Sequence, residues 1–394
     1  MKNGWQTKKL GELLEIQNGY AFSSQDYSAS GHFVMRIGNV QNGYVSLTDP
    51  KFIQLPADGS LQRFVLSEDD ILVSLTGNVG RVGVIKKEHL PAALNQRVAR
   101  ISIRKDSPAI RELLLFFLFS DWFREELIGA GHGAAQQNVS TKDIVEIQIP
   151  IPPLAEQQRI VGVLDEAFAG LATAQANAEK NLQNARALFA SYHNSIFARQ
   201  REGWTEKSLG EVCEYVNGKA HEQCIDKDGQ FIVINSKFIS TEGEILKRSN
   251  DALLLLQPGD IAMVLSDVPN GKALAKCFLV EEANTYTLNQ RICLLRSINF
   301  HTKFLFYQLN RNRHFLSFDN GENQTNLRLN QVLSCPLFLP PLAEQEIIAA
   351  KLDDLSEETQ RLGTLYERKL AALAALKKSL LNEAFTGQLT IDNG

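Results

Sequence analysis

Pro152-Pro153-Leu154-Ala155-Glu156-Gln157 decides how this chain is built, because the same hexapeptide returns as Pro340-Pro341-Leu342-Ala343-Glu344-Gln345. A short apolar, strand-like run precedes each copy, at residues 147–151 and 337–339. A long segment with apolar residues at helical spacing follows each copy. The short repeat periods of a solenoid are absent, so this pattern indicates that a whole domain and its helix were duplicated.

Two long helices are predicted, at residues 154–198 and 342–385. Apart from one step of seven from Leu373 to Leu380, their seam residues recur every three or four positions, which is the spacing of a coiled-coil seam. The seam residues are Val161, Leu164, Phe168, Leu171, Gln175, Ala178, Leu182, Ala185, Phe189, Tyr192 and Ile196 in the first helix, and Ile348, Leu352, Leu355, Thr359, Leu362, Tyr366, Leu370, Leu373, Leu380 and Ala384 in the second. A whole domain separates the helices, so we predict that they pack on each other as an antiparallel coiled coil. The other interpretation places the first helix on the surface of its own domain.

The predicted fold class is therefore α+β, with two similar mixed α/β domains and two long helices. The expected parts are a first domain at 1–151, a central helix at 152–199, a second domain at 200–339 and a C-terminal helix at 340–394. Trp5 and Trp204 open the two domains, and each is followed by Leu-Gly-Glu. Leu-Asn-Gln-Arg occurs in both, at 94–97 and 288–291, whereas the segments between these anchors differ. The pattern favours two copies of one recognition device that bind different targets.

Local patterns in the first domain predict its elements. Strands are expected at residues 33–37, 70–75, 97–103 and 144–151. A helix is expected at 107–128, with Ser107-Pro108 as its cap and first-turn proline, and a polar loop at 129–140. The glycines at positions 77, 80 and 83 are interpreted as tight turns that need a positive φ.

Composition excludes several classes of protein. The net charge is −4 and no segment is basic, so charge alone gives no indication of nucleic acid. No stretch approaches the roughly 20 apolar residues of a membrane span. The five cysteines are odd in number and show no CxxC spacing, which is typical of reduced thiols in a cytoplasm. No phosphate-binding loop, dinucleotide fingerprint, HExxH, nucleophile elbow or Asn-Pro-Pro-Tyr-type methyltransferase tetrad is present, so we expect no catalytic and no metal site.

The two hexapeptides before long helices, the Trp openings and the paired Leu-Asn-Gln-Arg segments resemble the specificity subunit of type I restriction–modification systems over the full length. The resemblance implies two target-recognition domains that each read one half of a bipartite, asymmetric double-stranded DNA site. It also implies that the helices measure the spacer. The subunit would bind no cofactor and would recruit two modification subunits and two motor-nuclease subunits. Those partners would use S-adenosylmethionine, ATP and Mg²⁺. Because no segment is basic, we expect the isolated chain to bind DNA weakly.

Base reading requires Arg, Lys, Asn, Gln or similar side chains on protruding loops. The candidates in the first domain are Arg36, Asn78, Arg81, His132, Gln136, Gln137 and Asn138; those in the second are Lys237, Asn270, Lys272, Asn323, Gln324, Asn326 and Arg328. The Asn, Gln and Arg of the two Leu-Asn-Gln-Arg segments recur although the targets should differ. They are therefore interpreted as framework or phosphate-positioning groups. Glu156 and Glu344 are expected in a first helical turn, where negative charge is favourable.

Two alternatives remain open at this stage. The chain could serve a methyltransferase-only system, without restriction. It could also be an adaptor or inhibitor that holds two protein-binding heads and contacts no DNA, an interpretation that the near-neutral charge favours. The divergent Asn-, Gln- and Arg-bearing loops on a duplicated framework argue against the adaptor.

Overall fold

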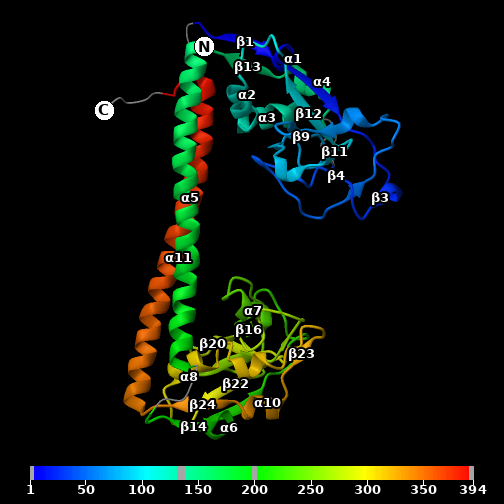
Figure 1. The fold of residues 1–394 in the computed structure, drawn as a ribbon. Coiled ribbons are helices and arrows are strands. Elements are labelled where there is room, and N and C mark those ends of the chain that lie inside the picture. The colour runs from blue at the N-terminus through cyan, green and yellow to red at the C-terminus, as the bar shows by residue number, and fades with distance from the viewer. Residues whose placement is uncertain (1–3, 131–137, 198–201, 390–394) are drawn as a thin grey trace. The chain divides into compact units, whose positions relative to one another are not determined.

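The computed structural model describes residues 4–130, 138–197 and 202–389. The chain divides into two compact units: Met1–Glu179 with Arg368–Gly394 is the first unit, and Lys180–Glu367 is the second. Two long helices, α5 (Leu154–Phe197) and α11 (Leu342–Thr386), contribute one part to each unit (Figure 1). The fold class is α+β with two long helices, as predicted.

A four-stranded antiparallel sheet lies at the centre of the first unit. Its strands, in order, are β10 (Val82–Val84), β9 (Ile71–Ser74), β12 (Val98–Ile103) and β2 (Leu14–Asn18). Alternate residues of β9 point to opposite faces. Ile71 and Val73 belong to the core shared with the helices, whereas Leu72 belongs to the core under a second sheet. The central sheet is therefore covered on both faces.

The remaining strands of the first unit form a second sheet and two ribbons. The second sheet has the order β3 (Tyr27–Ser28), β7 (Phe52–Ile53), β4 (His32–Met35), β11 (Ala92–Leu94), β8 (Val65–Leu66). In it, β4 and β11 run parallel. The ribbons are β1 (Gln6–Lys9) with β13 (Gln148–Ile151), and β5 (Val40–Gln41) with β6 (Tyr44–Val45). The strands expected at 33–37, 70–75 and 97–103 correspond to β4, β9 and β12.

Two of the helical predictions for the first unit are wrong. The expected single helix at 107–128 is two helices, α2 (Arg111–Leu118) and α3 (Asp121–Ala130). The break follows from Ser120, whose hydroxyl donates to the Phe117 carbonyl at 2.6 Å and accepts from the Phe123 amide at 3.2 Å. Ser107-Pro108 does not cap α2, because Ile110 occupies the N-cap position.

The prediction of a strand at 144–151 is wrong at its start, because the first residues of this segment belong to a short helix. Residues 144–146 belong to α4 (Thr141–Glu146), and only Gln148–Ile151 forms the strand β13. The Ser140 hydroxyl accepts from the Asp143 amide at 3.3 Å, and the Asp143 carboxylate accepts from the Ser140 amide at 2.7 Å. This capping box starts a helix inside a segment whose apolar spacing is typical of a strand. A further one-turn helix, α1 (Leu10–Leu13), packs beside α4.

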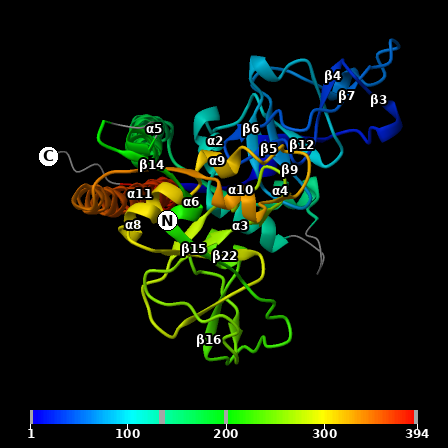
Figure 2. The same cartoon turned by 90° about the horizontal axis from the view of Figure 1, so that it is seen from below.

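The second unit repeats this layered plan. Its central sheet has the order β15 (Cys213–Asn217), β22 (Ile292–Ser297), β18 (Ile261–Val264), β20 (Cys277–Leu279), and its second sheet has the order β17 (Arg248–Ser249), β16 (Phe231–Ile234), β21 (Tyr286–Leu288). Again two strands, β16 and β21, run parallel. In Figure 2, α8 (Thr302–Leu309) lies to the left of β15 and β22, and β16 lies below them. The duplication inferred from the sequence is therefore a duplication of topology.

The other elements of the second unit frame its core. They are β14 (Thr205–Ser208) paired with β24 (Pro336–Leu339), β19 (Ser266–Asp267) paired with β23 (Thr325–Asn326), and the helices α6 (Leu209–Val212), α7 (Ser236–Ser240), α9 (Arg313–Leu316) and α10 (Leu329–Leu333). All five cysteines lie in this unit and are free thiols. Cys213, Cys277, Cys293 and Cys335 are buried, whereas Cys224 is partly exposed.

The two long helices pack antiparallel within each unit. In the first unit the Lys377 ammonium lies 5.1 Å from the centre of the Phe168 ring. In the second, Arg186 and Glu367 form an ion pair at 2.8 Å. Residues later in α5 therefore contact residues earlier in α11, so the two helices run antiparallel, as predicted. Gln175 is exposed and donates to Glu179 at 2.9 Å, and it lines a cavity together with Leu373 and Ala374 of α11, so this seam position faces the other helix without being buried.

The glutamine of each repeated hexapeptide is buried and ties its helix to its own domain. Gln157 is 1% exposed; its amide nitrogen donates to the carbonyls of Pro108 and Pro152, and its oxygen accepts from the Ile110 amide, each at 2.9 Å. Gln345, also 1% exposed, donates to Pro340 at 2.8 Å and accepts from the His301 amide at 3.0 Å. Ile110 and His301 are the N-caps of α2 and α8. Each glutamine therefore joins the start of a long helix to the start of a domain helix.

The glutamates of the hexapeptides lie in the first helical turn, as expected. They also have partners within their own units. Glu156 forms a two-pronged ion pair with Arg159 at 2.7 and 2.9 Å, and Glu344 accepts a hydrogen bond from the Trp204 indole at 3.2 Å. The Trp opening of the second domain is thereby fixed to the start of α11.

Replacing Gln157 with alanine should destabilise the first unit. The substitution leaves the Ile110 amide and two proline carbonyls without their partner, and we expect the free energy of unfolding to fall by about 3 kcal/mol. Urea denaturation of the full chain measures the effect. The exposed neighbour variant Gln158→Ala is the control and should change stability by less than about 0.5 kcal/mol. Equal stabilities of the two variants would contradict a structural role for Gln157.

Candidate nucleic-acid interface

Three segments lie side by side at the same edge of each unit. In the first unit the Leu75 amide donates to the Arg97 carbonyl at 3.0 Å, and the Leu75 carbonyl accepts from the Val139 amide at 2.9 Å. In the second unit Leu265 makes the same two bonds, to Arg291 at 3.0 Å and from Leu327 at 2.8 Å. We name the residues beside these bonds the rim: Thr76, Arg97 and Asn138 in the first unit, and Ser266, Arg291 and Asn326 in the second.

The rim of the first unit contains two of the predicted residues. Asn138 pairs with Thr76 through a β-bridge, and Asn78 is exposed in the turn that follows. This turn uses a positive φ at Gly77 (70°) and at Gly80 (78°), as expected, but not at Gly83. Gly83 instead lies tightly against the Tyr44 backbone. The turn therefore exposes Asn78 two residues after Thr76, the bridge partner of Asn138.

The other candidates of the first unit lie elsewhere. The Arg81 guanidinium donates to the Gln41 side chain at 2.7 Å and is half-buried over the hairpin of β5 and β6. Arg36 follows β4 in the second sheet, where it is paired with Asp49. His132, Gln136 and Gln137 lie outside the described residues.

Most candidates of the second unit gather at its rim. Asn326 pairs with Ser266, and the Gln324 amide donates to the Ser266 hydroxyl at 2.8 Å. Asn270 has a φ of 55° and donates to the Gly321 carbonyl at 3.2 Å, which links the two rim loops. The remaining candidates in these loops, Lys272, Asn323 and Arg328, are exposed. Lys237 is separate, because it lies in α7 beside the second sheet.

Asp267 shapes the rim of the second unit, although reasoning from the sequence did not select it. Its carboxylate accepts from the backbone amides of Val268, Ala273 and Leu274, at 2.9, 2.6 and 3.0 Å. The carboxylate binds backbone amides of its own loop, and every residue except proline carries such an amide. The only sign of this in the sequence is an Asp followed at short distance by a Gly.

The two Leu-Asn-Gln-Arg segments are turns of the framework. The Asn95 and Asn289 amides donate to Met35 and Ile234, at the ends of β4 and β16, at 3.3 and 3.0 Å. Gly19 and Gly218 pass so close to the Asn95 and Asn289 carbonyls that a methyl group could not fit. The arginines that follow, Arg97 and Arg291, are exposed, and neither guanidinium has a bonding partner among the described residues. The asparagines thus build the turn, and the arginines are available to an anionic ligand.

Ion pairs withdraw other arginines from binding. Arg100 pairs with Asp70 at 3.2 Å, and Arg296 forms two bonds, at 2.7 and 2.9 Å, with Asp260, which is 1% exposed. The hydrogen bond to Asp260 raises the pKa of the Arg296 guanidinium. Both pairs join the two central strands of a sheet, so their role is structural.

Residues 4–130, 138–197 and 202–389 contain neither a metal-binding cluster nor a helix that could span a membrane. No three His, Cys, Asp or Glu side chains there lie close enough to hold a metal ion. None of the helices described is both long and apolar enough to cross a bilayer.

The sequence profile of the family described as type I restriction modification DNA specificity domain matches residues 2–182 and 201–367. The chain belongs to this family. Similar proteins include the StySPI specificity subunit of Salmonella potsdam, 24% identical over 99% of this chain and 90% of that protein. The EcoAI specificity subunit of Escherichia coli is 28% identical over 42% of this chain and 28% of that protein.

Solved structures show the same fold. One chain, from work on the assembly and conformational transition of a type I restriction–modification system, matches with a TM-score of 0.77 and 19% identity over 99% of both chains. The HsdS subunit of Thermoanaerobacter tengcongensis matches with a TM-score of 0.57, also at 19% identity, over 99% of this chain and 98% of that one. These structures show the fold, and DNA specificity is the role given in the description of the family to which the chain belongs.

Asp267→Ala should loosen the rim loop of the second unit. Three backbone amides lose their shared acceptor, two of them in buried residues, and we expect the unit to lose about 2 kcal/mol of stability. Thermal denaturation and hydrogen exchange at the Ala273 and Leu274 amides measure the change. Asp228→Ala, at an exposed position of the same unit, is the control. Unchanged exchange at both amides would show that the carboxylate does not order the loop.

Proposed function

We propose that the chain is the specificity subunit of a type I restriction–modification complex and that its two rims read the two halves of a bipartite, asymmetric DNA site. The observation that carries this is the rim itself. The same hydrogen-bonded framework places an arginine and an asparagine at the same positions in both units, whereas the loops around them differ. The sugar–phosphate backbone of DNA is the same at both half-sites, which suits a framework that is the same in both units. The base sequences of the half-sites differ, which suits loops that differ.

The rim side chains have the chemistry of base readers. Asparagine and glutamine bond adenine in the major groove with an amide pair, and arginine bonds guanine or a phosphate. The loops of the second unit offer Asn270, Asn323, Gln324, Asn326, Lys272 and Arg328, and those of the first offer Asn78 and Asn138. The framework asparagines, Asn95 (buried) and Asn289 (partly buried), are less accessible than these rim side chains.

The proposal includes partners that supply chemistry this chain would lack. Two modification subunits would methylate adenine from S-adenosylmethionine, and two motor-nuclease subunits would use ATP and Mg²⁺, while this chain would bind no cofactor. The complex would act in the cytoplasm. The continuous helices α5 and α11 would set the unread spacer, because inserting residues into both changes the length of the connection between the units.

Methylation sequencing tests the proposal. Host DNA is compared with and without this gene while the modification subunit is present, and one bipartite adenine motif should disappear with the gene. Exchanging residues 1–151 for those of a relative should change one half of the motif only. An unchanged methylome beside an active modification subunit would favour the adaptor without DNA contact.

Two substitutions at the second rim should have different effects. Asn326→Ala should relax base preference in one half-site, at a cost of about 1–3 kcal/mol for the preferred base. Arg291→Ala should weaken binding to all sequences alike and lower the slope of log affinity against log salt by about one. Competition binding of the complex with its modification subunit, over a salt series, separates the two. A uniform loss from Asn326→Ala, or a base-specific loss from Arg291→Ala, would reverse the assignment.

A further inference from the structure

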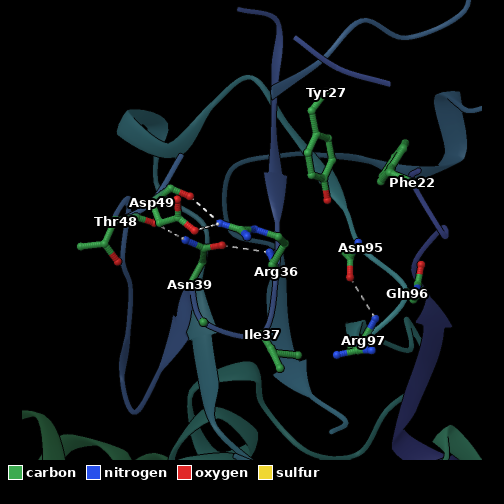
Figure 3. Close-up of a pocket in the computed structure, with 11 residues that line it drawn as sticks. Phe22, Tyr27, Arg36, Ile37, Asn39, Thr48, Asp49, Asn95, Gln96 and Arg97 are labelled. Carbon is green, nitrogen blue, oxygen red and sulfur yellow. Dashed lines mark hydrogen bonds and ion pairs between the residues drawn. The ribbon is translucent and has the colours of Figure 1, made fainter. Parts of the chain in front are cut away.

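A crevice of about 370 Å³ opens in the first unit where the parallel strands β4 and β11 end. Arg36 to Asn39 follow β4 and form one wall, and Asn95 to Arg97 follow β11 and form the other (Figure 3). The carboxyl ends of adjacent parallel strands are a common place for ligands, because the chain leaves them in different directions. The volume is in the range of small-molecule sites.

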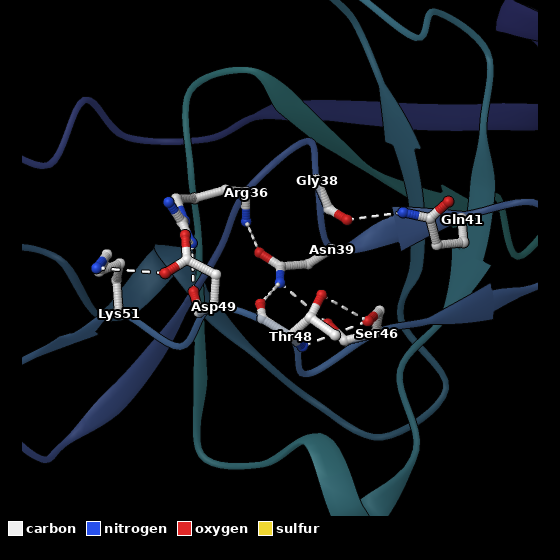
Figure 4. Close-up of polar contacts among 8 residues, drawn as sticks. All are labelled: Arg36, Gly38, Asn39, Gln41, Ser46, Thr48, Asp49 and Lys51. Atoms are coloured by element: carbon white, nitrogen blue, oxygen red, sulfur yellow. Dashed lines mark hydrogen bonds and ion pairs between the residues drawn. The ribbon is translucent and has the colours of Figure 1, made fainter. Parts of the chain in front are cut away.

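The Arg36 wall is held rigidly from behind (Figure 4). The Asn39 side chain is 2% exposed; its oxygen accepts from the Arg36 amide, and its nitrogen donates to the carbonyls of Ser46 and Thr48, each at 3.0 Å. The Arg36 guanidinium bonds the Asp49 carboxylate at 2.9 Å. This pair, with Lys51, holds the pKa of Asp49 below its usual value. The segment is therefore braced before any ligand arrives.

Both walls carry hydrogen-bond donors that have no acceptor among the described residues. The Arg36 Nε is buried and has no partner among the described residues. Asn95 is 7% exposed; its oxygen accepts from the Arg97 amide at 3.3 Å, while its side-chain nitrogen bonds no described residue. The Arg97 guanidinium likewise has no bonding partner among the described residues. Arg36 and Lys51 pair with the one carboxylate, Asp49, and Arg97 lines the other wall, so the crevice suits an anionic ligand rich in acceptors.

Aromatic and apolar side chains complete the crevice. Tyr27 and Phe22 line it between the two walls, and Ile37 lies on the opposite side (Figure 3). Phe22 is fixed from behind by an edge contact with Tyr20, with ring centres 5.1 Å apart. A ligand with a flat apolar ring could therefore contact Tyr27 while its anionic group meets the arginines.

The second unit is built differently at the corresponding place. There Asn235 follows β16, and its side chain accepts from the Lys237 and Phe238 amides, both at 2.9 Å, to start α7. A capped helix thus follows the strand where the first unit has the Arg36 segment. The crevice belongs to the divergent part of the duplication.

We propose that this crevice binds one nucleotide, with its phosphate at Arg97 and Arg36 and its base against Tyr27. A concave site cannot read base edges inside a duplex, so a nucleotide from DNA would have to be turned out of the helix. The alternative source is a free nucleotide. The DNA source rests on the proposed function, whereas the chemistry of the site is the same for both.

Titration of the full-length chain with dAMP, dGMP, dCMP and dTMP tests the site directly. We expect saturable binding of at least one, weakened about tenfold or more by Arg97→Ala, because a charge-assisted bond is lost. Arg97 is exposed, so its replacement should leave the melting temperature unchanged. Arg291→Ala is the matched control, since it removes the arginine of the same framework turn in the second unit. It should bind the monophosphates as tightly as wild type, although it weakens binding to duplex DNA.

Base-analogue fluorescence distinguishes the two sources. In the complex with the modification subunit, 2-aminopurine is placed at each position of the half-site that residues 1–151 control. A fluorescence rise at one position that Arg97→Ala abolishes assigns the crevice to a DNA nucleotide, and monophosphate binding without a rise assigns it to a free nucleotide. Neither binding nor a rise, or equal binding by wild type and Arg97→Ala, overturns the proposal. An intact methylation motif in that case leaves the specificity function standing.

Discussion

One buried glutamine side chain in each repeat joins the long helix to its domain, and the rest of the architecture depends on it. Gln157 and Gln345 saturate the backbone groups where a strand has ended and two helices begin, a place where secondary structure alone leaves donors and acceptors unpaired. Loss of this side chain would expose several polar groups to an apolar core at once. This explains why the whole hexapeptide, rather than its prolines alone, appears twice.

The layers behind the rims are more alike than the rims. Each unit places a four-stranded sheet between helices and a second sheet, and each uses a buried or half-buried Asp–Arg pair across its central strands. Packing constrains these interior positions strongly. Both faces of the central sheet are covered, so a change of side-chain volume in a strand disturbs the packing of the neighbouring layers. The loops beyond the strand ends carry no such constraint, so the two units could diverge there while keeping one framework.

The sequence predicted what is local or periodic. The seams of α5 and α11, the strands at β4, β9 and β12 and the duplicated anchors all follow from spacing. The break at Ser120 and the capping box at Ser140 were missed. In each case the apolar pattern continues through the serine, but the hydrogen bonds of its hydroxyl decide the local structure. The crevice could not be predicted, because Arg36 and Arg97 lie in segments far apart in the chain. They line one crevice only because the strands that precede them pair with each other. Asp267 was missed for a similar reason: its partners are backbone amides, which any residue carries.

The distribution of thiols has a practical consequence for chemical labelling. Burial raises the pKa of Cys213 and Cys335 to about 12 and that of Cys277 and Cys293 well above the ordinary value, so these sulfurs remain protonated and shielded near neutral pH. Cys224 is the one thiol that reagents can approach, although burial and Asp251 raise its pKa as well. A maleimide dye in mildly alkaline buffer would therefore mark a single position of the unmodified chain, and a spectroscopic reporter could be installed without mutagenesis.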